Sequence, residues 1–184
     1  MSGQIHLILG AMFAGKTTEL LRRKRRAELA GKKCLLIKYY GDNRYDETKI
    51  VTHDHITENA IISAGNSLKK TIDIIANLEN YHCIFIDEIQ FYQDGAQICD
   101  YLANSGFDVT VCGLQGDYQR NIFQCISDLI PKVEEIVHLT AIDKMTGNDA
   151  TFTARITSEL EQEVIGGGDK YMATDRKHYM SLQN

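Results

Sequence analysis

The chain has 184 residues, of which 43% are apolar and 24% are charged, and its formal net charge is −5. This length fits one main domain with a small appendage, and the apolar fraction is sufficient for a buried core. The acidic balance argues against a nucleic-acid polymer as the main ligand, because binding a phosphate backbone needs a basic surface, and no apolar run reaches the roughly 20 residues of a membrane span.

Strands and helices are predicted to alternate along the first 140 residues. Apolar runs predict strands at 4–9, 34–37, 83–86, 109–112 and 136–141. Helical patterns are found at 16–30, 68–78 and 95–104, and a polar loop is expected at 41–59. Such alternation implies parallel pairing with right-handed crossovers, so the predicted fold class is α/β with a doubly wound parallel sheet.

In the helix predicted at 16–30, an apolar stripe is expected to face the sheet, made of Leu20, Leu21, Ala27 and Leu29. The same helix carries five consecutive basic residues at 22–26. A basic run of this kind can bind nucleic acid or act as a nuclear localisation signal, but a solvated helix face is the favoured interpretation.

After Ala141 the chain becomes more polar, contains the glycine run 166–168 and lacks a long helical period. We therefore predict a nucleotide-binding domain at 1–140 and a small, lasso-like subdomain at 141–184. The single proline, Pro131, is expected to mark the end of a helix or a turn.

The cysteines are scattered and form no Cys-x-x-Cys pair: Cys34, Cys83, Cys99, Cys112 and Cys125. Most lie inside apolar runs, which predicts buried free thiols in a reducing compartment. The first residues lead directly into a predicted strand, so no signal peptide is expected. These features predict a cytoplasmic protein.

A phosphate-binding loop follows the first predicted strand. It reads Gly-x-x-x-x-Gly-Lys-Thr and consists of Gly10, Ala11, Met12, Phe13, Ala14, Gly15, Lys16 and Thr17. The backbone N–H groups of such a loop surround the β-phosphate of ATP, and Gly10 and Gly15 are expected to permit the backbone angles that this needs. Lys16 brings positive charge to the β- and γ-phosphates, and Thr17 offers a hydroxyl to Mg²⁺. The predicted fold is thus of the P-loop NTPase type.

Two acidic residues, Asp87 and Glu88, follow the third predicted strand. Beside a phosphate loop, Asp87 is expected to hold Mg²⁺ directly or through water. Because side chains alternate along a strand, the two carboxylates face different ways unless the strand ends between them. That geometry suits Glu88 as the base that accepts a hydroxyl proton in a kinase. In a motor ATPase the same glutamate would polarise water, and an acidic pair can also simply close an exposed strand end.

In combination these motifs resemble the thymidine kinase family found in animals, poxviruses and many bacteria, and the resemblance covers almost the whole chain. Besides the phosphate loop, it is carried by 37–45, by Thr52-His53-Asp54, by Asp87-Glu88-Ile89-Gln90-Phe91 and by 164–171. The resemblance implies transfer of the γ-phosphate of ATP to the 5′-hydroxyl of thymidine, and of deoxyuridine, giving dTMP in nucleotide salvage. It also implies that 141–184 form a lasso that closes over the nucleoside.

The resemblance further assigns roles to single residues. It implies Glu88 as general base, and Thr17 and Asp87 as the residues near Mg²⁺. The other residues implied on the phosphate side are Asp42, Asn43, Arg44 and Gln90. Those implied around the nucleoside are Met12, Phe91, Leu114, Tyr118, Thr153, Gln162, Glu163, Val164, Ile165, Gly166 and Tyr171. Such an aromatic and aliphatic pocket suits a planar ring with a methyl group, although each aromatic residue taken alone is more often plain core.

The sequence departs from the family pattern in the loop region at 114–120. It reads Leu-Gln-Gly-Asp-Tyr-Gln-Arg where the family has Leu-Asp-Gly-Thr-Phe-Gln-Arg. Tyr118 keeps a stacking face and adds a hydroxyl, whereas Gln115 and Asp117 change the local charge and hydrogen bonding. Ala11 also stands where a proline is usual, and Ile89 replaces a glycine.

A second departure concerns a structural zinc ion, which the family usually holds with four cysteines in two Cys-x-x-Cys pairs. The matching positions in this sequence are Asp143, Thr146, Asp175 and His178. One histidine with two carboxylates and a threonine is a poor zinc set, because structural sites use Cys and His. We therefore predict that no zinc is bound, and that packing, hydrogen bonds or an Asp–His pair hold the subdomain.

The resemblance also implies a homotetramer and feedback inhibition by dTTP. Two other functions stay open on the sequence alone: a P-loop ATPase, since 87–90 resembles a helicase box, and a nucleotide sensor that lost its chemistry. The acidic charge and the short chain argue against a motor ATPase. The presence of Lys16, Arg44 and Glu88 argues against a sensor.

Overall fold

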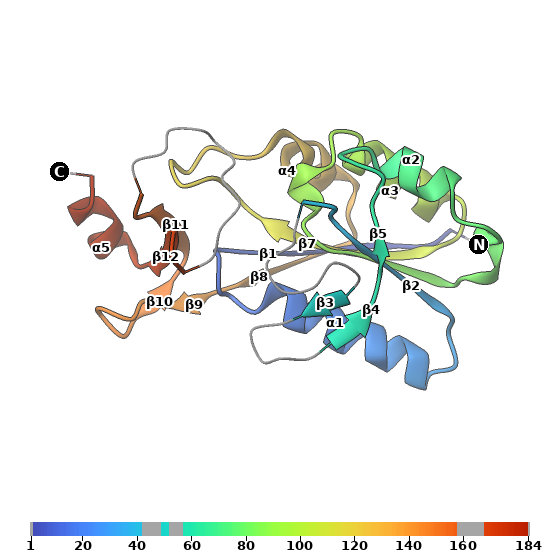
Figure 1. Cartoon of the computed structure of the whole chain (residues 1–184), viewed down its shortest axis with the longest axis horizontal. Helices are drawn as coiled ribbons and strands as arrows, with labels where there is room; N and C mark the ends of the chain where they lie inside the picture. The colour runs from blue at the N-terminus through green and yellow to red at the C-terminus, as the bar shows by residue number, and fades with distance from the viewer. Residues whose placement is uncertain (1, 42–48, 52–56, 158–167, 184) are drawn as a thin grey trace.

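The computed structural model describes residues 2–41, 49–51, 57–157 and 168–183. Within these ranges, six strands form a parallel central sheet in the order β5-β2-β6-β7-β1-β8 (Figure 1). The strands are β1 (Ile5–Gly10), β2 (Cys34–Lys38), β5 (Ile61–Ile62), β6 (Cys83–Ile86), β7 (Asp108–Leu114) and β8 (Glu135–Leu139). The predicted α/β fold with a parallel sheet is confirmed.

Helices cover both faces of this sheet (Figure 1). One face carries α1 (Lys16–Leu29), and the other carries α2 (Leu68–Asp73), α3 (Gly95–Asn104) and α4 (Gln124–Leu129). Short 3₁₀ turns lie at η1 (Leu78–Asn80), η2 (Ile89–Phe91) and η3 (Ile130–Lys132). Pro131 lies in η3 directly after α4, as expected for a residue that ends a helix.

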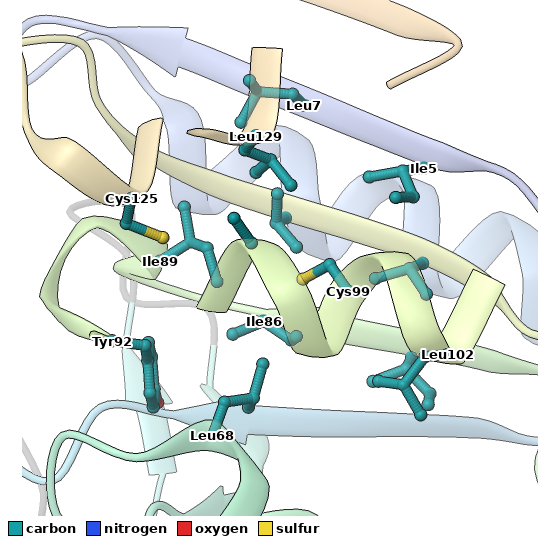
Figure 2. Packing of buried hydrophobic residues seen from close by; sticks show 14 of the residues in the cluster. Ile5, Leu7, Leu68, Ile86, Ile89, Tyr92, Cys99, Leu102, Cys125 and Leu129 are labelled. Carbon is teal, nitrogen blue, oxygen red and sulfur yellow. The ribbon is translucent and has the colours of Figure 1, made fainter. Parts of the chain in front are cut away.

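Each face of the sheet buries its own core, because side chains alternate along a strand. In β1, Ile5, Leu7 and Leu9 belong to the larger cluster, which also includes residues of α2, α3 and α4. Ile8, between them, packs instead with Leu20 of α1 in a second cluster. Figure 2 shows the larger cluster, in which strand residues pack against α3 and the end of α4. Burial on both faces explains why these strands read as continuous apolar runs.

The apolar stripe predicted for α1 is wrong at one residue. Leu20 and Leu21 are buried as expected, but Leu29 is 82% exposed. Nine residues along a helix of 3.6 residues per turn amount to two and a half turns, so Leu29 lies opposite Leu20. Lys24 lies on the buried side instead, where its ammonium group pairs with Glu28 at 2.8 Å. Most of the basic run 22–26 is nevertheless exposed or half-buried, in agreement with a solvated face.

The helix predicted at 68–78 is shorter than expected. It begins at Leu68, where Ser67 and Asp94 accept hydrogen bonds from the first backbone N–H groups, and it ends at Asp73. Asn77 adopts a left-handed conformation with φ 56°, which is incompatible with a continuing helix. The polar loop predicted at 41–59 also contains a short antiparallel pair, β3 (Lys49–Val51) with β4 (Thr57–Asn59).

The described residues after Thr140, 141–157 and 168–183, form small elements beside the phosphate loop (Figure 1). Two antiparallel pairs, β9 (Ala141–Ile142) with β10 (Asp149–Ala150) and β11 (Phe152–Arg155) with β12 (Tyr171–Thr174), precede α5 (Arg176–Ser181). Phe13 and Ala14 of the loop pack against Ala141, Ala150 and Ala173. The division of the chain at residue 140 stays a prediction. In the described ranges, no helix is long and apolar enough to cross a membrane.

Candidate active site

The phosphate-binding loop joins β1 to α1. Gly15, which precedes the first helical residue, has φ 79°, a left-handed angle that glycine permits, so the backbone freedom expected of it is confirmed. Gly10 has no such angle, and the prediction that it supplies one is wrong. A Cβ atom at Gly10 would lie 2.6 Å from the carbonyl oxygen of Leu139 and 3.0 Å from the Cβ of Ala14. Gly10 is therefore required because β8 and the loop approach it closely.

Lys16 and Thr17 begin α1. The Nζ atom of Lys16 donates a hydrogen bond to the carbonyl oxygen of Ala11 at 2.8 Å, which holds the ammonium group over the loop. The Thr17 hydroxyl lies 3.3 Å from each carboxylate oxygen of Asp87. The first backbone N–H groups and the positive dipole end of α1 lie at the same place. These features together make a site for an anion such as a triphosphate.

Asp87 follows β6 and is only 3% exposed. Its Oδ1 atom accepts hydrogen bonds from the Cys112 thiol at 2.8 Å and from the backbone N–H of Glu88 at 3.1 Å. Burial raises the pKa of the Cys112 thiol well above its ordinary value, and the Asp87 carboxylate raises it further, so the thiol keeps its proton and can donate it. Asp87 and Thr17 offer hard oxygen donors of the kind that Mg²⁺ prefers, and this pair therefore fits that ion.

Glu88 owes its direction to its backbone and to one neighbouring side chain. The strand β6 ends at Ile86, before both carboxylates, so alternation along a strand does not decide where they point, contrary to the sequence argument. Glu88 instead adopts a left-handed conformation with φ 53° and ψ 46°, which is uncommon for a residue other than glycine. Its Oε2 atom accepts a hydrogen bond from Nε2 of Gln90 at 2.6 Å.

Gln90 connects Glu88 to the end of β7. The side chain is 5% exposed, and its Oε1 atom accepts a hydrogen bond from the backbone N–H of Leu114 at 3.1 Å. Gly113 makes room for this contact, because a Cβ atom there would lie 2.4 Å from Oε1 of Gln90. The side chain of Gln90 thus bonds to Glu88 and to Leu114, and the phosphate-side role predicted for it stays a prediction.

The residues predicted around the nucleoside come from several elements. The backbone N–H of Met12 donates to the Thr153 hydroxyl at 3.0 Å, which joins the phosphate loop to β11. The Phe91 ring lies 4.9 Å from that of Tyr39 and meets Phe123 edge to face at 6.2 Å. These contacts hold Met12, Thr153 and Phe91 in place.

Arg155, which belongs to none of the sequence motifs, joins two of the predicted nucleoside residues. Its guanidinium carbon lies 3.9 Å from the centre of the Tyr118 ring, and its Nη2 atom donates to the Tyr171 hydroxyl at 2.8 Å. Arg155 is two residues after Thr153 on β11, so both side chains leave the same face of the strand. This spacing from Thr153 is the signal that could have identified it.

Gln115 and Asp117, which depart from the family pattern, form hydrogen bonds within the protein. Asp117 is 7% exposed, and its Oδ1 atom accepts hydrogen bonds from the backbone N–H groups of Gln119 at 2.9 Å and Asn121 at 2.8 Å. Nε2 of Gln115 donates to the carbonyl oxygen of Thr151 at 2.8 Å. Both side chains therefore stabilise the loop that carries Tyr118.

Several predicted site residues lie outside the described ranges: Asp42, Asn43, Arg44, Gln162, Glu163, Val164, Ile165 and Gly166. The motif Thr52-His53-Asp54 lies outside them as well.

Comparison with known proteins identifies relatives along nearly the whole chain. A family model described as thymidine kinase matches residues 3–179. Thymidine kinase 1 of Dictyostelium discoideum is 43% identical over 188 residues, which cover 100% of this chain and 81% of that protein. The thymidine kinase of Raccoon poxvirus is 42% identical over 179 residues, or 97% of this chain and 98% of the viral protein. The thymidine kinase of Rabbit fibroma virus (strain Kasza) is 44% identical over 177 residues, 96% of each chain.

Proposed function

The chain belongs to the thymidine kinase family, and we propose that it transfers the γ-phosphate of ATP to the 5′-hydroxyl of thymidine, and of deoxyuridine, in nucleotide salvage. As a member of this family it is an ATP-dependent transferase. The observation that carries the proposal is the arrangement of two neighbouring carboxylates. Asp87 is bonded to Thr17 of the phosphate loop, whereas Glu88 is held by Gln90. One carboxylate thus serves the metal side of the reaction and the other serves an acceptor hydroxyl.

On the donor side, the β- and γ-phosphates of ATP bind the loop 10–17 and the N-terminus of α1. Lys16 exchanges the Ala11 carbonyl for a phosphate oxygen and brings its charge to the transferred group. Thr17 and Asp87 would hold Mg²⁺, which when bound neutralises charge on the phosphates. Asp42, Asn43 and Arg44 are assigned to the same phosphates on the strength of the sequence resemblance.

On the acceptor side, Glu88 accepts the proton of the 5′-hydroxyl while that oxygen attacks the γ-phosphorus. The new P–O bond forms as the bond to the β–γ bridging oxygen breaks, so ADP leaves and the proton remains on Glu88. A positioned base of this kind typically contributes ~10²–10⁴-fold to the rate. The bond from Gln90 supports this role, because a general base must be held in a defined direction.

The nucleoside base is assigned to the region around Met12, Phe91, Leu114, Tyr118, Thr153 and Tyr171. Arg155 supports this part of the proposal, because it holds the Tyr118 ring and ties it to Tyr171. The backbone of 162–166 is assigned to the edge of the pyrimidine, again from the resemblance. Backbone amides and carbonyls can recognise such an edge without charged side chains.

Three further properties belong to the proposal: assembly as a homotetramer, feedback inhibition by dTTP and a cytoplasmic location. The first two rest on the sequence resemblance. The described cysteines are free thiols, four of them buried, and this supports a reducing compartment.

Transfer of radiolabelled phosphate from ATP to a panel of nucleosides tests the proposed function. We expect labelled dTMP and dUMP from thymidine and deoxyuridine, with slower transfer to deoxypurine nucleosides. Hydrolysis of ATP without nucleoside phosphorylation would favour the ATPase function instead. Tight ATP binding with neither reaction would favour a nucleotide sensor.

A further inference from the structure

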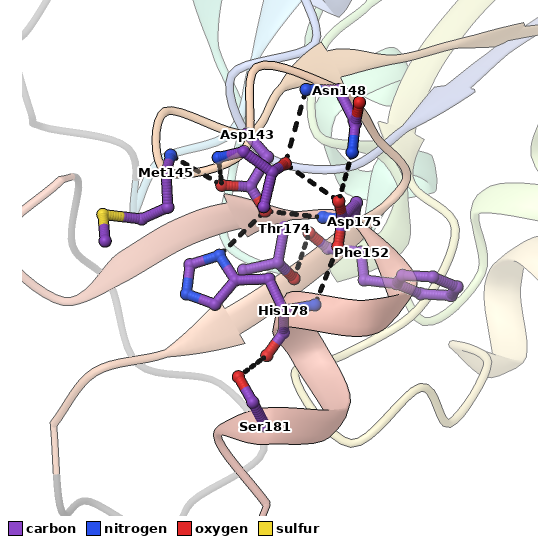
Figure 3. Close-up of polar contacts among 9 residues, drawn as sticks. Asp143, Met145, Asn148, Phe152, Thr174, Asp175, His178 and Ser181 are labelled. Carbon is purple, nitrogen blue, oxygen red and sulfur yellow. Dashed lines mark hydrogen bonds and ion pairs between the residues drawn. The ribbon is translucent and has the colours of Figure 1, made fainter.

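Two segments that lie about thirty residues apart along the chain meet at the start of α5 (Figure 3). Asp143 and Thr146 belong to the turn between β9 and β10, and Asp175 and His178 begin α5. The Nδ1 atom of His178 lies 2.8 Å from Oδ2 of Asp143, and the Thr146 hydroxyl donates to Oδ2 of Asp175 at 2.8 Å. These are the positions at which the resembled family carries its four zinc-binding cysteines.

The donor set does not fit zinc. Structural zinc sites use four sulfur or nitrogen ligands, and this group offers a single imidazole. The carboxylate of Asp143 can only accept, so Nδ1 of His178 carries the proton and cannot bind a metal ion. Across the described ranges, no group of three or more His, Cys, Asp or Glu side chains is arranged to hold a metal ion.

The oxygens of Asp143 are instead occupied by protein donors. Asp143 has 0% exposure, and it accepts hydrogen bonds from the backbone N–H groups of Met145 and Asp175, each at 2.9 Å, in addition to that from His178. Burial opposes the charge on Asp143, but the two backbone donors and His178 outweigh it and lower its pKa. The buried carboxylate is therefore charged and satisfied at neutral pH.

The carboxylate oxygens of Asp175 likewise accept hydrogen bonds from protein donors. Its Oδ1 atom accepts the backbone N–H of His178 at 2.7 Å and caps α5, while its Oδ2 atom accepts from Asn148 and Thr146, each at 2.8 Å. The His178 backbone donor, followed by the Asn148 and Thr146 side chains, lowers the pKa of Asp175 to about 2. Each aspartate thus joins the β9–β10 turn to α5.

We propose that this cluster of Asp143, Thr146, Asn148, Asp175 and His178 replaces the structural zinc, so that the C-terminal part of the chain folds without a metal ion. These hydrogen bonds take the structural role of a metal ion, because they join the same two segments of the chain. The cluster also helps to position the proposed nucleoside site, a consequence that rests on the proposed function. The hydroxyl of Tyr179, in α5, donates to the carbonyl oxygen of Tyr118 at 2.6 Å.

Metal analysis and thermal unfolding of the purified full-length chain test the proposal, and neither depends on kinase activity. We expect fewer than about 0.1 zinc per chain, and a melting temperature that changes by less than about 1 °C after dialysis against a zinc chelator. Activity measured after removal of the chelator and addition of Mg²⁺ should match that of the untreated protein. One zinc per chain, or a fall in melting temperature on chelation, would overturn the proposal.

Substitutions test whether the cluster itself holds the structure. His178→Ala and Asp143→Ala should each lower the melting temperature by about 5 °C or more, since each breaks a buried network. The matched control is Lys177→Ala, an exposed residue of α5, with an expected change below about 1 °C. If Asp143→Ala does not fold, Asp143→Asn, which keeps the shape of the side chain, should lower the melting temperature by less than the alanine variants do. Equal melting temperatures for His178→Ala and Lys177→Ala would contradict the proposal.

A gain of zinc binding provides the converse test. The combined variant Asp143→Cys, Thr146→Cys, Asp175→Cys and His178→Cys should bind about one zinc per chain and lose thermal stability on chelation. A folded variant that binds no zinc would contradict the inference that these four positions lie where the family holds its zinc ion.

Discussion

The side-chain amide of Gln90 holds Glu88 through a hydrogen bond of 2.6 Å, while its oxygen accepts the backbone N–H of Leu114 at 3.1 Å. One side chain thus connects the proposed base to the carboxyl end of β7. Glu88 has a left-handed backbone, so this bond helps to keep an uncommon conformation in place.

Replacing Gln90 by Glu separates these two contacts. The variant keeps an acceptor for the Leu114 N–H but loses the donor to Glu88, so kcat should fall about tenfold or more. Gln90→Leu loses both contacts and should also lower the melting temperature. Gln93→Glu, at an exposed position nearby, is the control. A kcat for Gln90→Glu within about threefold of wild type would show that Gln90 does not position the base.

Arg155 is expected to act on the nucleoside and not on ATP. Arg155→Met removes the contact with the Tyr118 ring and the bond to the Tyr171 hydroxyl. The KM for thymidine should rise about tenfold, and Arg155→Lys should recover only part of it because lysine lacks the planar fork. Steady-state kinetics with each substrate varied in turn measure both effects. Arg26→Met, at an exposed site on α1, should change neither KM, and an equal rise in both KM values for Arg155→Met would contradict the assignment.

Gly10 and Gly31 allow a direct comparison of crowding with backbone strain. Gly31 has φ 78°, and a Cβ atom at this position would meet nothing within 4 Å, so Gly31→Ala should cost only the backbone strain of a left-handed alanine, about 1–2 kcal/mol of unfolding free energy. Gly10→Ala would press against the Leu139 carbonyl and should cost about 1–3 kcal/mol, with weaker ATP binding as well. Denaturant unfolding and ATP titration measure these effects. Unchanged ATP affinity in Gly10→Ala would contradict the close approach described for the loop.

Glu19 should give the protein a dependence of stability on acid pH. The hydrogen bond from Arg22, with further pairing to Arg23, outweighs burial and lowers the pKa of Glu19 from 4.5 to about 2. Since the folded-state pKa is the lower one, the stabilisation is present above pH 4.5 and is lost as pH falls toward about 2. The unfolding free energy of Glu19→Gln should therefore lie below that of wild type at pH 7 and approach it as pH falls toward about 2. The control is Glu79→Gln, at an exposed position of η1. A difference in unfolding free energy between wild type and Glu19→Gln that stays constant with pH would refute the prediction.

The sequence predicts the central sheet well because its strands are buried on both faces. Residues such as Leu7, Ile8 and Ile86 have no solvent side to mark with polar residues, so each strand appears as an apolar run. The strands from β9 to β12 are two to four residues long, too short for a period to be recognised. Their positions depend on contacts with the phosphate loop and α5, which a local pattern does not contain.

In the candidate active site, too, some residues can be predicted from a local pattern and others depend on contacts between distant segments. Lys16, Thr17 and Asp87 can be predicted because phosphate and metal chemistry requires these residue types after particular strands. The partners Cys112 and Arg155 could not be predicted with equal ease, since each acquires its role from a contact with a segment distant in the sequence. Asp143 and His178 are an intermediate case, in which a departure from a known pattern leaves packing, hydrogen bonds or an Asp–His pair open, and the structure contains the Asp–His pair.

Removal of the nucleoside 5′-hydroxyl proton by Glu88 is tested by the kcat of the Glu88→Gln variant. The glutamine can still bond to Gln90 but is a poor base, so kcat with thymidine should fall by ~10²-fold or more. The ATP dissociation constant, measured in the same preparation, should change little, because the phosphate loop is intact. A kcat within about threefold of wild type would contradict the assignment of Glu88 as the base.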